Sequence, residues 1–502
     1  MAASPHSPDR SFLQSLLAML GISLVLMLAA LDQTVIGNAL PSIVADLNGF
    51  DFYAWVGTSY LLTSIIAIPI FGRLGDFYGR KPFVVAATCV FTVASLGCGM
   101  AHTMEQLIVA RALQGIGGGM LIGTTFACIP DLFPDTRQRL RWQVMLSSAF
   151  SVVNALGPLL GGVLTSHYGW RSVFYLNVPL GGIALWFAWR YLPWYHPAEA
   201  RPMALDTLGA LLIAVALGGI QLFVEWAPHA EHWVEAWVVG GGSVAAIVAL
   251  YLWERCCRAP LMPPALFARA DMRILFGVAV LVGAVMFALL FYMPLLFQGS
   301  YGYSPSDAGI LMTPMVLSIT VGAIINSRLI RFLKSPNTLP KLGLAALLLA
   351  CVGLATCGHR ASFGMLLGLM LLAGGGLGFV LLNLTLFTQT LAEPRHLGIA
   401  TALVQSLRLV GGLLGAAAMG AVITFFYRYA LWQQVGKIPA AMLSTLQDPQ
   451  VLLNPTVISD SALVIAREAL SSAMSFGLGG AAVVTGVAFC CFWPLKRVVL
   501  FN

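Results

Sequence analysis

The feature that most constrains this chain is a series of apolar runs, each about 20 residues long, that recurs along nearly its whole length. A helix of that length crosses the hydrocarbon core of a bilayer. Only 9% of the 502 residues are charged, whereas soluble domains carry about 25% charge. The sequence therefore predicts an all-α polytopic membrane protein and excludes an ordinary soluble fold.

We expect fourteen transmembrane helices. Their ranges are 13–40, 53–72, 83–101, 106–130, 142–165, 173–193, 205–226, 236–255, 273–297, 306–327, 341–358, 363–388, 397–426 and 472–494. The first run is too long for a removable signal peptide and has no small-residue cleavage site. An even number of helices places both termini on the same side.

The basic residues are distributed unevenly between the two sides. With the N-terminus in the cytoplasm, 20 of the 27 Lys and Arg residues lie on the cytoplasmic side. Five lie outside (Arg171, Arg360, Arg428, Lys437 and Arg467) and two lie within helices (Arg111 and Arg408). Basic loops that face anionic lipid explain the net charge of +7 without a nucleic-acid partner. The Ala- and Gly-rich composition suggests a bacterial inner membrane.

Catalytic and metal-binding patterns are missing from the sequence. The nine Cys residues have no metal-ligand spacing, and we expect neither a disulfide nor a metal site. His229 and His232 lie on a short loop among Trp residues, which makes a metal site there a weak hypothesis. No phosphate-binding Gly-x-x-x-x-Gly-Lys-Ser/Thr loop occurs. We therefore expect no enzyme activity, no cofactor and no use of ATP.

An acid lies within the first predicted helix, in the stretch Leu31–Pro41. Asp32 precedes Leu40 by eight residues, roughly 12 Å of helix, where a charge costs about 2.5–3.5 kcal/mol. Arg111 lies roughly 8 Å from the outer end of the fourth predicted helix, so the two charges reach comparable depth. A buried charge needs a partner, and we expect these two to pair. Asp32 is either a reversible proton carrier or half of a static salt bridge.

Three further stretches have unusual glycine spacing. The predicted loop between the second and third helices contains Gly72, Asp76, Gly79 and Arg80, where the glycines permit a tight turn and close backbone approach. The fourth helix contains Arg111-Ala-Leu-Gln114-Gly-Ile-Gly. The fifth contains Gly157-Pro158-Leu-Leu-Gly161-Gly162, in which the glycines permit close packing and the proline bends the helix.

Together these stretches resemble the motifs of the major facilitator superfamily, in particular its fourteen-helix drug:proton antiporter branch (the EmrB-like and QacA-like multidrug exporters). The Leu-Asp-x-Thr stretch of the first helix is similar to that branch's own motif. The resemblance implies proton coupling through Asp32 and Arg111. It also implies conformational gating by Gly72, Asp76, Gly79, Arg80 and the glycine–proline element of the fifth helix. In the family pattern, Asp76 would cap the helix that begins near His396–Gly398.

The domain organisation follows from a weak internal repeat. Glycines 374–376 and Gly411 correspond to glycines 117–119 and Gly157, with similar separations along the chain. We therefore expect a major facilitator fold with an N-terminal six-helix bundle (1–193), two inserted helices with a linker (194–257) and a C-terminal six-helix bundle (258–502). Trp170, Arg171 and Asn177 are interpreted as an interfacial group with a structural role.

The longest expected outside loop, 427–471, allows two interpretations. It is either a cover or a dock for a periplasmic adaptor that leads to an outer-membrane channel. Its last part, Ser461–Leu470, has the pattern of an amphipathic helix.

A substrate cavity should lie between the bundles near the middle of the membrane. The side chains that we expect there are Gln33, Asn38, Gln114, Asn154, Tyr292, Met293, Phe297, Asn383, Gln405 and Arg408. Arg408 has no obvious acidic partner in the C-terminal bundle, so it would meet backbone carbonyls or an anionic group of the substrate.

The sequence favours a proton-driven exporter of amphipathic, mainly cationic, drugs or toxic compounds. The alternative is a proton-coupled symporter for a nutrient or organic ion on the same fold. A membrane-embedded enzyme or sensor is less favoured because no cluster of catalytic side chains is present.

Overall fold

A computed structural model gives the arrangement of the chain. It describes residues 12–125, 128, 132, 136–193, 206–227, 232–257, 264–330, 332–333, 335–357, 361–392, 397–434, 446, 452 and 460–495. Throughout these residues the secondary structure is helical, and none of them forms a strand. Thirteen helices in this part of the chain are long and apolar enough to span a membrane, and α6 is a further long helix. The predicted all-α polytopic fold is confirmed.

The N-terminal bundle contains seven helices, because the sixth predicted span is broken into two. They are α1 (Phe12–Leu47), α2 (Tyr53–Tyr78), α3 (Arg80–Gly99), α4 (Met104–Thr125), α6 (Thr136–Tyr168), α7 (Arg171–Tyr175) and α8 (Asn177–Tyr191). A short helical turn, η1 (Phe50–Phe52), joins α1 to α2.

Two helices, α9 (Thr207–Trp226) and α10 (Trp233–Cys256), separate this bundle from the next. The C-terminal bundle contains α11 (Pro264–Ala268), α12 (Ala270–Leu295), the π-helical turn η3 (Leu296–Ser300), α13 (Pro305–Leu329), α14 (Thr338–Thr356), α15 (Phe363–Leu391), α16 (Leu397–Trp432) and α18 (Asp460–Phe492). Helix α9 of the inserted pair contacts both bundles, through α2 and α16, and α10 packs on α9.

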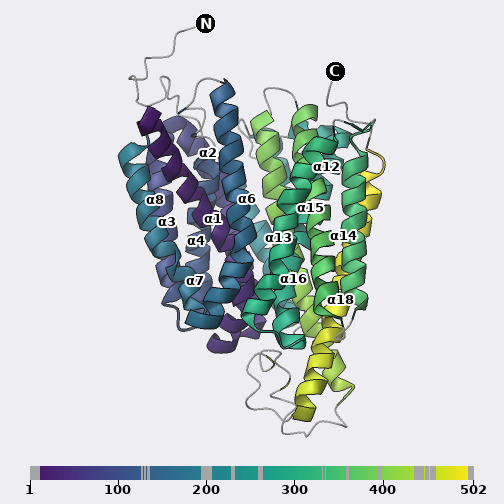
Figure 1. Ribbon diagram of the computed structural model, residues 1–502. Helices are drawn as coiled ribbons and strands as arrows, with labels where there is room; N and C mark the ends of the chain where they lie inside the picture. Colours follow the sequence, from purple (N-terminus) through teal and green to yellow (C-terminus); the bar gives the residue numbers. More distant parts are fainter. Residues whose placement is uncertain are drawn as a thin grey trace.

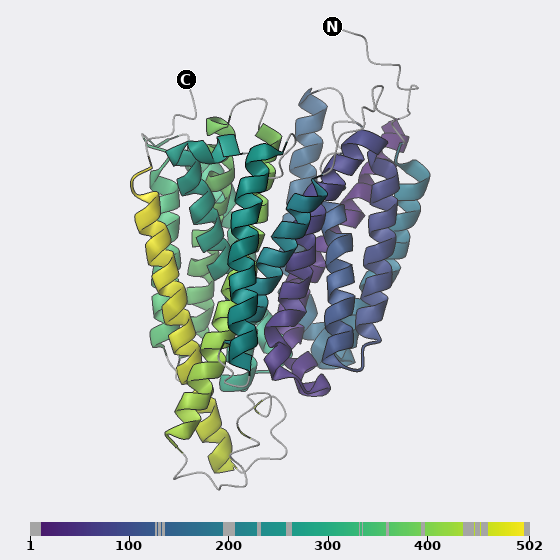
Figure 2. The ribbon, with the colours of Figure 1, turned by 180° about the vertical axis from the view of Figure 1, so that it is seen from behind.

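The two bundles stand side by side, with α6 and α13 at the boundary between them (Figure 1). Helix α1 begins and α18 ends at the same end of the molecule, which we call the near end; α1 ends at the opposite, far end. Viewed from behind, α16 and α18 project past the other helices at the far end (Figure 2). This arrangement agrees with an even number of spans.

Several helix boundaries differ from the prediction because tertiary contacts extend the helices beyond their apolar runs. Helix α1 continues through Pro41 to Leu47, where Asp46 pairs with Arg171. Asp32 is therefore about 22 Å along the helix from its far end, not 12 Å.

The predicted loop around Gly72 is mostly helix. Helix α2 runs to Tyr78, and α3 begins at Arg80, so Gly79 alone separates them.

The outside loop is also shorter than predicted. Helix α16 extends to Trp432, and α18 already begins at Asp460. The segment Ser461–Leu470 is thus the start of a spanning helix and not a separate amphipathic one. Most of the remaining segment lies outside the described residues. The prediction that this segment docks a periplasmic adaptor depends on those residues and stays a prediction.

Candidate functional site

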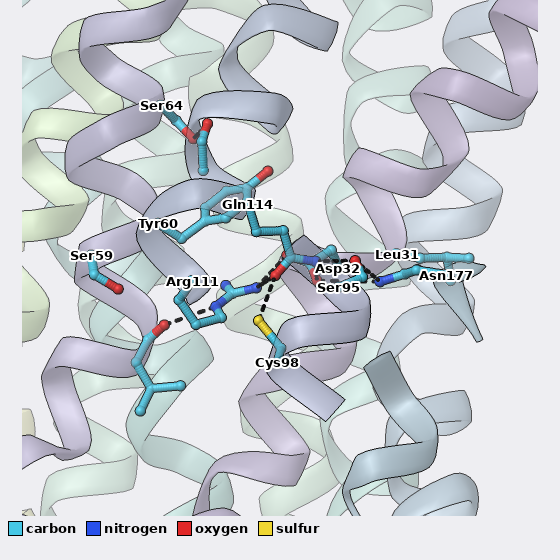
Figure 3. Close-up of polar contacts among 12 residues, drawn as sticks. Leu31, Asp32, Ser59, Tyr60, Ser64, Ser95, Cys98, Arg111, Gln114 and Asn177 are labelled. Carbon is cyan, nitrogen blue, oxygen red and sulfur yellow. Dashed lines mark hydrogen bonds and ion pairs between the residues drawn. The ribbon is translucent and has the colours of Figure 1, made fainter. Parts of the chain in front are cut away.

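A polar cluster lies in the interior of the N-terminal bundle, around Asp32. Arg111 Nη1 is 2.6 Å from Asp32 Oδ2, and Gln114 Nε2 donates to Asp32 Oδ1 at 2.8 Å (Figure 3). Gln114 also accepts from Arg111 Nη1 at 2.7 Å and donates to Ser95 Oγ at 2.7 Å. The three residues close a ring of hydrogen bonds that joins α1 to α4.

Further contacts hold the arginine in place. Arg111 Nε donates to the carbonyl of Val56 on α2 at 3.0 Å. The guanidinium lies 4.6 Å from the ring centroid of Tyr60, also on α2, and 6.0 Å from that of Phe174 on α7. A cation over an aromatic ring is attracted by the negative ring face. Arg111 is thus fixed by α1, α2, α4 and α7 together.

This cluster is closed to solvent. Asp32 is 3% exposed, Arg111 1% and Gln114 0%. Two opposite charges removed from water are tolerated only when they are close and their remaining hydrogen-bonding capacity is satisfied, and both conditions hold here. Loss of the negative charge on Asp32 would leave Arg111 without its counter-ion.

The predicted pairing of Asp32 with Arg111 is confirmed; its role in proton coupling stays a prediction. The sequence does not predict the outer members of the cluster. Asn177 Nδ2 on α8 lies 3.5 Å from Asp32 Oδ1 and 3.4 Å from Ser95 Oγ. Asn177 is therefore part of the Asp32 cluster, whereas the sequence predicts only a structural role at the membrane interface. Cys98 on α3 donates to Gln114 at 3.5 Å. Polar residues inside apolar runs were the available signal, but nothing in the sequence shows which way they point.

A second set of contacts joins the two bundles toward the far end, and we call it the far-end seam. Gln298 donates to the carbonyl of Asn38 at 3.0 Å, and Tyr53 donates to the carbonyl of Phe291 at 2.7 Å. Ser306 N donates to Ser166 Oγ at 3.1 Å. These bonds link α1, α2 and α6 to α12, η3 and α13. The molecule is held together at this end.

The glycine–proline element of α6 lies at the same seam. A Cβ on Gly309 of α13 would come 2.6 Å from the carbonyl oxygen of Pro158, and one on Gly162 would overlap Pro305. Asn38 donates to the carbonyl of Pro158 at 2.6 Å. Only glycine permits such close backbone approach between α6 and α13. Gly157 and Gly161 pack on α1 instead, against Thr34 and Val35.

The other gating candidates lie at the near end. Gly79 has a φ of +85°, which L-residues with a side chain rarely adopt, and it makes the sharp turn that the sequence predicts. A Cβ on Gly72 would lie 3.4 Å from the carbonyl oxygen of Gly123, so α2 approaches α4 closely there. Arg80 opens α3. The side chain of Asp76, and its proposed partner near His396, lie outside the described residues.

The predicted substrate-binding residues fall into two groups. Five of them are enclosed: Gln114 in the Asp32 cluster, Asn383 bonded to Asn326 at 2.9 Å, and Tyr292, Met293 and Phe297 in the core. Asn38 is also buried, in the far-end seam. The half-buried ones are Gln33, Asn154, Gln405 and Arg408. Four of the ten predicted residues are therefore partly exposed in this conformation. Among the described residues no group of His, Cys, Asp and Glu could hold a metal.

The chain was compared with protein families and with curated proteins. Residues 22–416 match the family model described as Major Facilitator Superfamily. Multidrug resistance protein 3 of Bacillus subtilis (strain 168) is 31% identical over 91% of this chain and 90% of its own length. Multidrug transporter protein MdtP of the same organism is 32% identical over 80% of this chain and 74% of its own.

Solved structures agree on the fold. A bacterial homologue of the human lysosomal transporter Spinster, in an inward-facing and occupied conformation, superposes with a TM-score of 0.71 at 16% identity and covers 99% of this chain and 98% of its own. A D-xylose–proton symporter gives a TM-score of 0.60 at 13% identity, with coverage of 97% and 99%. At these identities the likeness concerns the fold alone.

Proposed function

The chain belongs to the Major Facilitator Superfamily and is a multi-pass membrane transporter, not an enzyme; on that premise we propose that it exports amphipathic drugs or toxic compounds in exchange for protons. Relatives that are named multidrug transporters support the drug substrates. In this proposal the near end faces the cytoplasm of a bacterial inner membrane. The proton gradient drives the cycle.

The observation that carries the proton coupling is the enclosed carboxylate of Asp32. Its only charged partner among the described residues is Arg111, at 2.6 Å. A carboxylate without access to water changes its charge only when the protein around it rearranges, because each charge state requires different partners. Proton uptake and conformation are therefore linked at this position. A static salt bridge would show no such link.

Helix α1 provides the mechanical connection between the cluster and the far-end seam. Asp32 lies little more than one turn from Gly37, and a Cβ on Gly37 would come 2.6 Å from the carbonyl oxygen of Leu290 on α12. The next residue, Asn38, accepts from Gln298. A shift of α1 that follows protonation of Asp32 would therefore move the contacts that hold the far end closed. Alternating access requires such a link.

Export then follows from reciprocal coupling. Proton binding at Asp32 that favours the state open at the far end also favours substrate release there. By linkage, substrate must change the proton affinity of the transporter by the same factor as the proton changes substrate affinity. The cycle needs no covalent intermediate and no nucleotide.

Proton release from the lumen of energised everted vesicles, followed with a pH-sensitive dye during addition of cationic, neutral and anionic drugs, tests this proposal. Wild type should release protons in response to some of these compounds, and Asp32→Asn should not. Asp46→Asn is a matched control, because Asp46 lies on the same helix in a half-exposed pair at the far end. It should behave as wild type.

The remaining outcomes distinguish the alternatives. Drug-induced proton release that survives Asp32→Asn would keep the exporter and remove Asp32 from the coupling. Proton movement in the direction of substrate uptake, with nutrients and not with drugs, would favour a symporter instead.

A further inference from the structure

Arg408 is a cation within a spanning helix and has no partner among the residues that the structure describes. It follows the start of α16 by about three turns, roughly 16 Å. It makes no hydrogen bond or ion pair with any residue that the structure describes, and its Nε atom is buried without a partner. Arg111 in the other bundle, by contrast, bonds to a carboxylate, an amide and a carbonyl.

An unpaired charge in a membrane span is costly, and such residues almost always face the bundle interior or a water-filled cavity. Arg408 is half-buried, so part of its surface is exposed. A role in fold stability would require a partner, which the described part of the protein does not supply. The unused donors of the guanidinium are therefore available to a ligand.

The glycines that follow Arg408 on α16 show where its side chain begins. Gly411 and Gly415 pack against the backbone of Val280 and Ala284 on α12. Arg408 precedes them by three and seven residues, so it lies on the same stripe of α16. The backbone of Arg408 itself packs against Gly283 of α12. The side chain thus begins at the seam between the first and the fifth spanning helix of its bundle.

The N-terminal bundle has an equivalent residue. On α6, Gly157 and Gly161 pack against α1 with the same spacing as Gly411 and Gly415 against α12, and Asn154 precedes Gly157 by three residues. Asn154 is half-buried like Arg408. Because α6 packs on α1 with the same glycine spacing as α16 on α12, the two positions are equivalent in the two bundles. Transporters built from two such repeats bind substrate between them.

We propose that Arg408 binds an acidic group (a carboxylate, sulfonate or phosphate) of an amphipathic substrate, with the Asn154 amide as a polar contact from the opposite bundle. The inference rests on the proposed transport function and extends its substrates from cations to organic acids. A guanidinium is suited to this task because its planar fork donates two parallel hydrogen bonds to an oxyanion. No acidic side chain has to be displaced first.

Equilibrium binding to the purified full-length protein, without a proton gradient, tests the proposal separately from transport. The probes are 2-naphthylacetate, 2-naphthylethylamine and 2-naphthylethanol, which share an aromatic body and differ in charge. Isothermal titration calorimetry in phosphatidylcholine nanodiscs gives each Kd. Arg408→Gln should weaken binding of the acid about tenfold or more and leave the alcohol and amine within about twofold.

Two further variants separate charge recognition from structural damage. Arg408→Lys should recover part of the affinity for the acid, because it restores the charge without the fork. Arg190→Gln removes an exposed arginine at the near end of α8 and should change no Kd. Equal losses for all three probes, no effect of Arg408→Gln on the acid, or no binding of the acid by wild type would each overturn the proposal.

A lipid head group has the same chemistry as an acidic substrate. Replacing part of the phosphatidylcholine with phosphatidylglycerol should not change the Kd of 2-naphthylacetate if the site takes a soluble acid. Weaker binding of 2-naphthylacetate (a higher Kd) to wild type in the presence of phosphatidylglycerol, with no such change in Arg408→Gln, would support the anion site and identify a lipid phosphate as its occupant. The comparison of wild type with Arg408→Gln is made with Asp32 unchanged, so a failure of the proton-coupling proposal in Asp32→Asn would not decide the outcome of this binding experiment.

Discussion

The two bundles treat their buried arginines in opposite ways. Arg111 in the N-terminal bundle is 1% exposed, and its guanidinium bonds to Asp32, Gln114 and a backbone carbonyl. Arg408 in the C-terminal bundle is half-buried and bonds to none of the described residues. Similar helix packing in the two bundles thus surrounds one arginine with hydrogen-bond partners and leaves the other without them among the described residues. A satisfied pair can respond to a proton, whereas an unsatisfied cation can respond to an anion.

The largest effect should come from breaking the N-terminal pair. Arg111→Met leaves Asp32 buried without a counter-charge and should lower the free energy of unfolding by about 3–5 kcal/mol, measured by thermal unfolding in detergent. The double variant Asp32→Asn/Arg111→Met should recover most of this loss. Arg171→Met, which breaks a half-exposed pair with Asp46, is the control. If both single variants cost the same, the Asp32 cluster is not the stabilising unit that we describe.

A smaller loss should follow from removal of the neutral member of the cluster. Gln114→Leu takes a donor from Asp32 and Ser95 and should cost about 1–3 kcal/mol in the same assay. Gln106→Leu, at an exposed position in the first turn of α4, loses only a solvent-exposed hydrogen bond from the backbone of His102 and should cost less, about 0.5 kcal/mol. Equal stability of these two variants would mean that water replaces the lost donor and that the cluster is not closed.

The C-terminal arginine should behave differently. Arg408→Met removes a cation that has no partner in the described part of the chain, so the unfolding temperature should stay the same or rise. The unfolding temperature of Arg408→Met is compared with that of Arg111→Met under the same conditions. A loss as large as that of Arg111→Met would reveal a protein partner for Arg408 and would weaken the case for a ligand.

The smallest effect is expected at the exposed edge of the far-end seam. Arg428 lies 3.5 Å from Asp51 across the bundles, with both side chains well exposed, and such pairs contribute about 0–1 kcal/mol. Arg428→Gln should shift the far-end distance distribution, measured between spin labels, only slightly. The shift should disappear at about 1 M salt, where screening acts over about 3 Å. A large, salt-independent shift would make this pair a principal gate.

The sequence predicts much of the fold because a bilayer demands long apolar helices, and it predicts the Asp32–Arg111 pair because two buried charges at similar depth need each other. The sequence does not show that Asn177 and Ser95 belong to the Asp32 cluster. On a helix that is apolar on all sides, the hydrophobic pattern does not show which face turns toward a neighbour. The sequence also does not predict the ends of the helices, because these depend on contacts with other helices. Helix α1 continues past Pro41, and Asp46 near its end pairs with Arg171 on another helix.

The sequence by itself determined the class of protein, the spans, the family motifs and the two intramembrane arginines. Composition, run length and residue type suffice for these because they reflect the cost of polar groups in lipid. Tertiary structure decided that Gln114 completes the Asp32 cluster, while Arg408 pairs with none of the described residues. That distinction depends on which helices meet and at what rotation, and only the packing of side chains from distant parts of the chain sets both.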